Sequence, residues 1–205
     1  MIKGIDVSRW QGLIDWEKVK ASGCEFVLLK AGGSDSGFYT DSKFYYNYGE
    51  AIDAGLHVGA YYFVGPNCTN ATAGAGDAYR FYKIIEGLKL DYPVYIDFEA
   101  PKAYNKQGNT EAVATFCRYM ENLGYYAGIY ASDISGFKDR LDLPKLAAFD
   151  KWVARYGSEP KFVTNWGIWQ ATSKGVVSGI VGNVDIDYSR NDYAKIIRDN
   201  HLNHL

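Results

Sequence analysis

The sequence predicts an α/β fold, a shortened TIM-like β/α barrel of eight strands and about five helices. Short β-rich apolar runs alternate with helical stretches over the first two-thirds of the chain, a pattern typical of βαβ units around a parallel sheet. The last three expected strands are joined by loops with no room for a full helix. A complete (β/α)₈ barrel usually needs ~250 residues. The 205 residues of this chain therefore fit a barrel only if some helices are missing.

Each expected element follows from its local pattern of apolar residues. Strands are predicted where apolar, β-branched and aromatic residues run together over a short stretch. In chain order they are residues 2–7, 26–30, 57–64, 92–98, 125–131, 152–156, 167–171 and 184–188. Helices are predicted where apolar residues recur every three to four positions. In chain order they are residues 16–21, a stretch through Phe44 and Ile52, and residues 78–88, 110–123 and 193–200.

Residues typical of turns and helix ends support these boundaries. Asp15 precedes the first helix and is a residue type that caps helix N-termini. Gly55 and Gly124 follow the second and fourth helices, where glycine suits the left-handed conformation behind a helix. The glycines at 32 and 33 and the polar stretch 67–72 are expected to form loops.

An open, doubly wound sheet is the alternative for such an alternation. It is disfavoured because no G-x-G-x-x-G follows the first strand and no Walker loop is present. No internal repeat, linker or low-complexity segment divides the chain. Residues 1–205 are therefore expected to form a single domain.

Composition narrows the class of function. The 22 Lys and Arg residues are interspersed with 24 Asp and Glu residues for a net charge of −2, which argues against a nucleic-acid-binding surface. No apolar run approaches the ~18 residues of a membrane span, and the amino terminus lacks the pattern of a secretion signal. The chain is expected to be soluble, with no membrane insertion.

Cysteine and histidine offer little for catalysis or metal binding. Cys24, Cys68 and Cys117 are odd in number and widely spaced, so buried free thiols are expected rather than disulfides or a zinc site. Two of the three histidines lie in the last five residues. A Ser/His/Asp triad or a histidine metal site would therefore depend on His57 alone.

Carboxylates gather at the expected strand ends. Asp6 closes the first strand, Asp97 and Glu99 close the fourth, and Asp185 and Asp187 lie in the last. Side chains alternate along a strand, so Asp97 and Glu99 share one face with their Cα atoms roughly 6–7 Å apart. Active sites of β/α barrels lie at the carboxyl ends of the strands. Burying acids there is costly unless they are paired or hydrogen-bonded, so the cluster indicates a site.

Two chemistries suit this cluster. Oxygen ligands of this kind bind Mg²⁺ or Ca²⁺. Glycoside hydrolysis instead uses one carboxyl group as a proton donor and another to stabilise positive charge at the anomeric carbon. Aromatic residues, 16% of the chain, favour sugar binding, since six of them lie at or near strand ends: Trp10, Tyr61, Tyr62, Trp152, Trp166 and Trp169. The plainer interpretation is that the acids cap helices and the aromatics fill the core.

At these residues the sequence resembles the glycoside hydrolase family 25 lysozymes, the muramidases of phage endolysins and bacterial cell-wall enzymes. The matching runs are 4–12 (GIDVSRWQG), 26–30 (FVLLK), 59–63 (GAYYF), 97–99 (DFE), 127–130 (AGIY), 152–156 (WVARY), 169–170 (WQ), 179–180 (GI) and 182–185 (GNVD). Together they span about residues 4 to 188. A lone DFE is a weak signal, whereas this ordered series is specific.

The resemblance implies hydrolysis of the β-1,4 bond between N-acetylmuramic acid and N-acetylglucosamine in the glycan strands of bacterial peptidoglycan. Glu99 would be the general acid, and Asp97 would orient the substrate's 2-acetamido group, whose carbonyl oxygen attacks the anomeric carbon with retention. Asp6 and Asp185 would complete the acidic base of the groove and help to keep Glu99 protonated by repulsion. A direct nucleophilic or inverting role for Asp6 or Asp97 stays open.

The resemblance also suggests sugar contacts, and it implies neither a metal nor a cofactor. The suggested sugar-binding residues are Tyr61, Tyr62, Trp152 and Gln170. A monomer is expected that acts on the bacterial cell wall, either outside the cell or after release by lysis.

Two positions depart from the family pattern or leave it ambiguous. The family commonly has Lys, any residue, Ser or Thr, Glu and Gly after the second strand, whereas Gly33 stands here in place of the acid. In the last strand either Asp185 or Asp187 suits the expected acid, and Asp185 is the better match.

Two other functions remain as alternatives. One is a peptidoglycan-binding module that has lost turnover, which Gly33 favours and the retained acids oppose. The other is a chitinase, although the DxxDxDxE signature expected of those enzymes is absent before Glu99.

Overall fold

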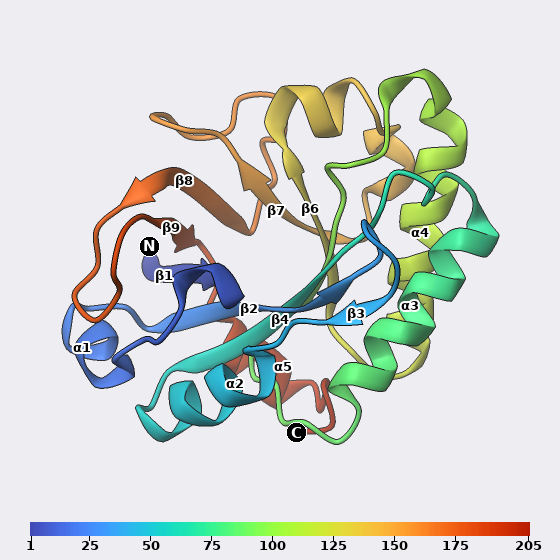
Figure 1. Ribbon diagram of the computed structural model, residues 1–205. Helices are drawn as coiled ribbons and strands as arrows, with labels where there is room; N and C mark the ends of the chain where they lie inside the picture. Colours follow the sequence, from blue (N-terminus) through green and yellow to red (C-terminus); the bar gives the residue numbers. More distant parts are fainter.

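The computed structural model describes residues 1–205, except for the side chain of Ala103, and its central feature is a sheet closed into a barrel (Figure 1). The sheet has the strand order β1-β9-β8-β7-β6-β5-β4-β2-β3, and β1 also pairs with β2. This extra pairing closes a barrel of eight strands and leaves the two-residue β3 on the edge of β2. The predicted shortened β/α barrel is confirmed.

The strands are β1 (Ile2–Val7), β2 (Phe26–Gly33), β3 (Tyr39–Thr40), β4 (His57–Phe63), β5 (Val94–Asp97), β6 (Ala127–Ser132), β7 (Asp150–Ala154), β8 (Ile168–Gly175) and β9 (Val184–Ser189). The α-helices are α1 (Trp16–Ala21), α2 (Phe44–Asp53), α3 (Ala71–Ile85), α4 (Lys106–Asn122) and α5 (Tyr193–Asp199). Short 3₁₀ turns lie at Arg9–Gln11, Ala103–Asn105 and Leu143–Leu146, and a π-helical turn at Asp133–Lys138. No helix of the described chain has the length and apolar character that a bilayer span requires.

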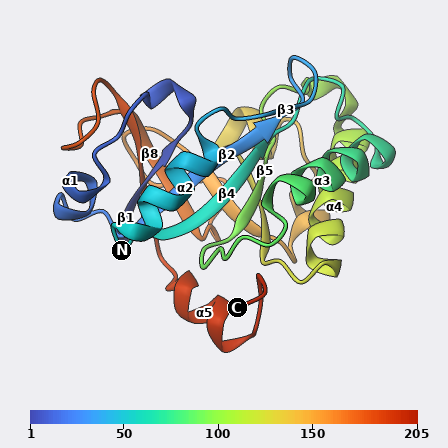
Figure 2. The same ribbon diagram turned by 60° about the horizontal axis from the view of Figure 1, so that its bottom comes forward.

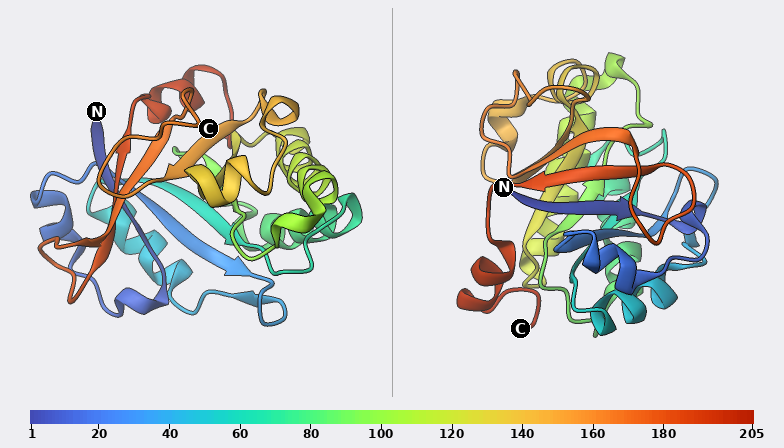
Figure 3. Two further views of the ribbon diagram at one scale, coloured as in Figure 1. Left: turned by 90° about the horizontal axis from the view of Figure 1, so that it is seen from above. Right: turned by 90° about the vertical axis from the view of Figure 1, so that its left-hand side faces the viewer.

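Strand β9 is the antiparallel strand of the barrel. The pairs from β1 through β2, β4, β5, β6 and β7 to β8 are parallel, whereas β9 is antiparallel to both β8 and β1. A parallel connection needs a crossover of a dozen or more residues, and the short segment 176–183 between β8 and β9 does not provide one. Figure 3 shows β8 and β9, in orange to red, beside the blue β1 at the closing seam.

Helix boundaries follow the capping residues more closely than the apolar pattern. Helix α1 begins behind Asp15 as expected, and the Asp15 side chain accepts a hydrogen bond from the amide of Lys18 at 3.2 Å. Helix α3 begins at Ala71 rather than near residue 78. The Asn70 side chain caps it by accepting from the amide of Ala73 at 2.9 Å, so the polar stretch expected to be a loop contains a helix start.

The long connection between β7 and β8, residues 155–167, is organised without a helix. The buried carboxylate of Asp133 accepts hydrogen bonds from the amides of Lys161, Phe162 and Val163 and an ion pair from Arg155 at 2.9 Å. Burial alone would raise the pKa of Asp133, but these donors outweigh it and lower the pKa. This loop therefore has a fixed course over the barrel rim.

The aromatic residues divide between two packed regions. Tyr61, Tyr95, Tyr130 and Trp152 point into the barrel, where Trp152 is 1% exposed. Tyr62, the next residue along β4, points outward and packs against Phe81 of α3 and Phe116 of α4. Alternation along β4 thus separates two neighbouring tyrosines. Cys24, Cys68 and Cys117 are buried free thiols, as predicted.

The carboxyl-terminal residues of the chain cover the barrel at the amino-terminal ends of its parallel strands. Helix α5 lies there, apart from the other helices (Figure 2). Asn203 is fully buried there and donates to the carbonyl oxygens of Leu90 and Tyr92 at 2.8 and 3.0 Å. It also accepts from the amide of Tyr126 at 2.7 Å. These bonds satisfy strand-end groups that lack ladder partners.

Candidate active site

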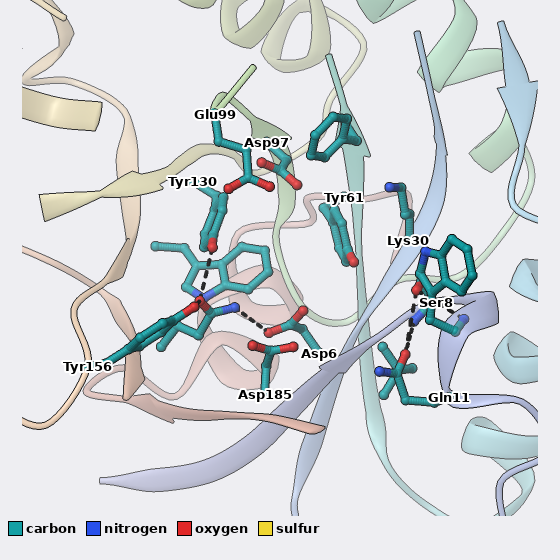
Figure 4. A pocket seen from close by; sticks show the side chains of 15 residues that line it. Asp6, Ser8, Gln11, Lys30, Tyr61, Asp97, Glu99, Tyr130, Tyr156 and Asp185 are labelled. Carbon is teal, nitrogen blue, oxygen red and sulfur yellow. Dashed lines mark hydrogen bonds between the residues drawn. The ribbon is translucent and has the colours of Figure 1, made fainter. Parts of the chain in front are cut away.

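A cavity of about 260 Å³ opens at the carboxyl ends of the parallel strands (Figure 4). Four of the acids singled out from the sequence line it: Asp6, Asp97, Glu99 and Asp185. The other lining residues are Val7, Ser8, Trp10, Gln11, Lys30, Tyr61, Phe63, Tyr130, Trp152, Tyr156 and Gln170. The fold therefore brings together acids that are far apart in the sequence.

Strand direction explains how each acid reaches the cavity. Asp6 and Asp97 lie at or next to the carboxyl ends of β1 and β5, and Glu99 follows β5. Asp185 was expected at the carboxyl end of its strand, but it is the second residue of β9. Because β9 is antiparallel, its beginning lies at the mouth, and Asp185 pairs in register with Asp6. In Figure 4 the carboxyl groups of Asp6 and Asp185 face each other.

Gln170 holds Asp6 in place. Its Nε2 donates to Oδ2 of Asp6 at 2.7 Å, and its Oε1 accepts from the hydroxyl of Tyr130 at 2.9 Å and from that of Tyr156 at 3.3 Å. Gln170, which was predicted to bind sugar, thus uses its side-chain amide for hydrogen bonds within the protein. The pKa of Asp6 is raised well above its usual range, first by burial and then by the charges of Asp187 and Asp185.

Asp97 and Glu99 lie side by side on the opposite wall (Figure 4). Asp97 is 4% exposed, and its Oδ1 has no hydrogen-bond partner among the described residues. Burial and then the charge of Glu99 raise the pKa of Asp97 well above its usual range, whereas Lys30 lowers it. Burial also raises the pKa of Glu99, against Lys30 and Arg140. Glu99 keeps solvent contact at the rim, so its shift is expected to be the smaller one.

Repulsion from Asp6 and Asp185 is not what raises the pKa of Glu99, contrary to the expectation from sequence. Burial is the cause. The repulsion acts in the other direction, because burial first and the charge of Glu99 last raise the pKa of Asp185 to about 6.

The predicted aromatic contacts are only partly brought to the cavity. Tyr61 lines it directly. Trp152 forms the floor, with its ring centroid 4.3 Å from that of Tyr130 and 5.5 Å from that of Tyr61. Tyr62 does not reach the cavity, because it lies on the outer face of β4 and is 1% exposed. We therefore withdraw Tyr62 as a contact in this cavity.

Comparisons with known proteins identify the family. Residues 5–180 match the family model described as glycosyl hydrolases family 25.

The chain belongs to glycosyl hydrolase family 25.

It is 33% identical over 192 residues to the autolytic lysozyme of Clostridium acetobutylicum, with 91% of this chain aligned, and it spans 55% of that relative's length. The structure of the CTP1L endolysin superposes with a TM-score of 0.83 at 28% identity, covering 97% of this chain and 70% of that one. The modular autolysin LytC of Streptococcus pneumoniae, solved with a synthetic peptidoglycan ligand, gives 0.78 at 26% identity, covering 91% of this chain and 46% of LytC. This chain thus belongs to a family of glycosyl hydrolases, and its relatives include lysozymes.

Several cavity residues of this family 25 chain were not chosen from its sequence. Lys30, Tyr130 and Tyr156 line the cavity. Lys30 lies three residues before the end of β2, Tyr130 two residues before the end of β6, and Tyr156 two residues beyond the end of β7. The rule that selected the acids could have found the two tyrosines, which stand in the matched runs 127–130 and 152–156. Lys30 carried the same signal, since it ends both the matched run 26–30 and the strand expected there, although β2 continues to Gly33.

The space beside Gly33, where family 25 commonly has an acid, is filled by a tyrosine. A Cβ atom at residue 33 would lie 2.7 Å from the carbonyl oxygen of Phe63 and 2.8 Å from the hydroxyl of Tyr39. Tyr39 belongs to β3, which pairs with β2, and its hydroxyl donates to Asp35 at 2.8 Å. A side chain at residue 33 would therefore collide with Tyr39 of β3 and with the main chain of Phe63.

Asp187 lies beneath the cavity rather than in its lining. It is fully buried, its Oδ1 accepts from the indole N–H of Trp152 at 2.8 Å, and its Oδ2 has no partner among the described residues. Asp185 is the acid of β9 that reaches the cavity. Within the described residues there is no group of three or more His, Cys, Asp and Glu placed to share a metal ion.

Asp187→Asn is expected to stabilise the fold at pH 8 by about 2 kcal/mol and to change little at pH 4. Burial raises the pKa of Asp187 from 3.8 to about 8, although the Trp152 hydrogen bond opposes the rise. The folded state then binds the proton more tightly than the unfolded state, so this contribution to stability is lost as pH rises from about 4 to 8. Asn cannot ionise and keeps an acceptor for the Trp152 indole. Urea unfolding across this range checks the prediction, and parallel pH curves for both proteins would contradict it.

Proposed function

We propose that this family 25 chain is a lysozyme that cleaves the β-1,4 bond between N-acetylmuramic acid and N-acetylglucosamine in bacterial peptidoglycan. The pairing of Asp97 and Glu99 carries the proposal: a buried carboxyl group with an unpartnered oxygen stands beside a rim carboxyl group whose pKa is raised. The printed names of its relatives, an autolytic lysozyme, an endolysin and an autolysin with a peptidoglycan ligand, support the same substrate.

Glu99 is the general acid of the proposed reaction. Its raised pKa favours the protonated carboxyl group, which donates its proton to the glycosidic oxygen as the bond to the anomeric carbon breaks. Arg140 fixes the segment by donating to the carbonyl oxygen of Glu99, which leaves the side chain free to reach the substrate.

Asp97 positions the substrate's own nucleophile. Its Oδ1 would accept the N–H of the 2-acetamido group, and the acetamido carbonyl oxygen would attack the anomeric carbon to form an oxazolinium ion. A water molecule, deprotonated by Glu99, would then open this ring and restore the starting configuration at the anomeric carbon.

In this scheme, substrate binding also determines whether Asp97 or Glu99 carries the proton needed for catalysis. In the free protein burial favours a proton on Asp97 even more than on Glu99. A hydrogen bond from the acetamido N–H favours the charged form of Asp97, and the proton then belongs to Glu99, where the leaving group needs it.

Asp6 and Asp185 stabilise positive charge from the other side of the cavity in this scheme. Gln170 and the hydroxyl of Tyr130 keep Asp6 in one orientation. Trp10, which is 77% exposed, and Tyr156, which is 57% exposed, offer flat faces for sugar rings at the rim. We place the enzyme's action at the bacterial cell wall.

Digestion of purified peptidoglycan tests this function. New reducing ends should appear, and mass spectrometry of the borohydride-reduced products should find them on muramic acid. New ends on glucosamine would overturn the assigned bond. Binding without new reducing ends would favour the non-catalytic module, and cleavage of chitin alone would favour the chitinase. Addition of EDTA should leave the rate unchanged, whereas loss that Mg²⁺ restores would favour metal chemistry.

A further inference from the structure

A second pocket lies beside the proposed active site, behind the ring of Tyr39. The amine of Lys30, which lines the active-site cavity, lies 5.8 Å from the centroid of this ring, and the guanidinium of Arg9 lies 5.7 Å from it. Tyr39 also lines a neighbouring hollow of about 260 Å³ together with Phe38, Tyr62 and Arg80. Tyr39 therefore lines this hollow and also lies close to Lys30 of the acidic cavity.

Arg80 presents an unpaired cation at this hollow. Its guanidinium stacks on the ring of Phe38, 3.3 Å from the centroid, although Phe38 is 59% exposed. Arg80 donates to the carbonyl oxygen of Gly76 at 3.0 Å, and no ion pair to it is found among the described residues. The neighbouring cation Lys83, in contrast, is neutralised by Glu86. Arg80 thus keeps free N–H donors in the planar arrangement that matches a carboxylate.

A buried hydroxyl group lines the same hollow without a partner. Tyr62 is 1% exposed, and its hydroxyl makes no hydrogen bond within the described part of the chain. An unsatisfied buried hydroxyl costs free energy that a ligand's acceptor would recover. Tyr62, which does not line the catalytic cavity, therefore borders this hollow with a hydroxyl group that lacks a partner among the described residues.

The stack of Phe38 and Arg80 also borders another, larger hollow of about 560 Å³, which is lined in part by acidic residues. Asp35 and the buried Asp77 line it. Arg80 lines both hollows, and its charge acts to lower the pKa of Asp77, so a ligand lying across the stack meets a cation and carboxyl groups close together. A polyphosphate would be repelled by the acids, whereas a peptide that carries both carboxylate and amino groups suits both hollows.

We propose that these two hollows bind the stem peptide that peptidoglycan carries on N-acetylmuramic acid, with a peptide carboxylate on Arg80 and the hydroxyl of Tyr62. The proposal rests on the proposed function, because the glycan strand in the groove delivers the peptide to its flank. The site would make the enzyme prefer glycan strands that still bear peptides over strands from which an amidase has removed them.

Kinetics on matched substrates test this site. Purified glycan strands with and without stem peptides are compared for the unaltered protein and for Arg80→Gln. The substitution should raise KM about tenfold on peptide-bearing strands and leave peptide-free strands unaffected. Tyr62→Phe, which keeps the ring packing, should raise KM about threefold on the same substrate. Arg118→Gln, an exposed arginine on α4, is the matched control and should change neither.

Four outcomes would overturn the proposal. An equal effect of Arg80→Gln on both substrates would indicate a structural role, and no effect on either would remove Arg80 from recognition. Equal kinetics of the unaltered protein on both substrates would show that the peptide is not recognised. The preference for peptide-bearing strands could also disappear when hydrofluoric acid removes phosphate polymers from the walls. That result would assign the pocket to those polymers.

Calorimetry with soluble N-acetylmuramoyl tripeptide keeps this site separate from the proposed function. If the unaltered protein cleaves neither strand, the proposed function fails. Tripeptide binding that Arg80→Gln weakens about tenfold would still support the site, and absent binding would overturn it as well.

Discussion

Glu99→Gln is expected to lower kcat on purified peptidoglycan by about 10³-fold, since general acid catalysis contributes on the order of 10²–10⁴. Gln cannot deliver the proton that the leaving glycosidic oxygen needs. The side chain lies at the solvent-exposed rim, and the contact of Arg140 is with the main chain of Glu99, so the fold should be unaffected. Release of reducing ends gives the rate, and thermal unfolding with sedimentation of the protein on walls gives stability and binding.

Two further measurements make this test specific to Glu99. The rate of the unaltered enzyme should fall as pH rises through the raised pKa of Glu99, because the general acid then loses its proton. An exposed acid outside the cavity, Glu111 on α4, provides the control, and Glu111→Gln should keep full activity. A Glu99→Gln protein that retains a tenth or more of the rate would remove Glu99 from the role of acid.

Asp97→Asn is expected to lower kcat by about 10²-fold while leaving the fold at least as stable near neutral pH. The charge of Asp97 stabilises the oxazolinium ion, and Asn would also present an N–H where the acetamido N–H needs an acceptor. Burial raises the pKa of Asp97, so its carboxylate is destabilising in the folded state and its removal relieves that cost as pH rises. Kinetics and unfolding of the same preparation separate the two effects.

Substrate chemistry decides between the roles left open for Asp97 and Asp6. Glycan strands whose muramic acid lacks the N-acetyl group should not be cleaved, because the nucleophile is missing. The first product observed by NMR should have the β configuration. Rapid cleavage of deacetylated strands, or a first product in the α configuration, would replace acetamido assistance with a direct nucleophile or an inverting mechanism. A near-normal rate for Asp97→Asn would contradict its positioning role.

Local sequence was enough to predict the frame of the molecule. The run 2–7 and the helix behind Asp15 were placed as the structure has them, since each depends on neighbouring residues alone. Helix α3 was started too late because the cap at Asn70 lies within a stretch whose composition is typical of a loop. The short β3 escaped prediction because its two residues gain their conformation from pairing with Gly32 and Gly33.

The acids at the strand ends also divide into those that local sequence could predict and one that depended on more than local sequence. Asp6, Asp97 and Glu99 could be chosen from sequence, because the carboxyl ends of parallel strands meet at one mouth. In the last strand the sequence offered both Asp185 and Asp187, and the family resemblance selected Asp185. Its position at the start of β9 is productive because that strand is antiparallel, a property that the chain's pairing decides.

The sequence by itself determined the barrel class, the family and the set of acids, because these depend on short apolar runs and on residue types at fixed spacing. Tertiary structure alone decided what each side chain faces. It turned Tyr61 into the cavity and Tyr62 away from it, engaged Gln170 with Asp6, and set Tyr39 in the space beside Gly33. These outcomes arise from strand register, strand direction and burial, which are set by contacts between residues distant in the chain.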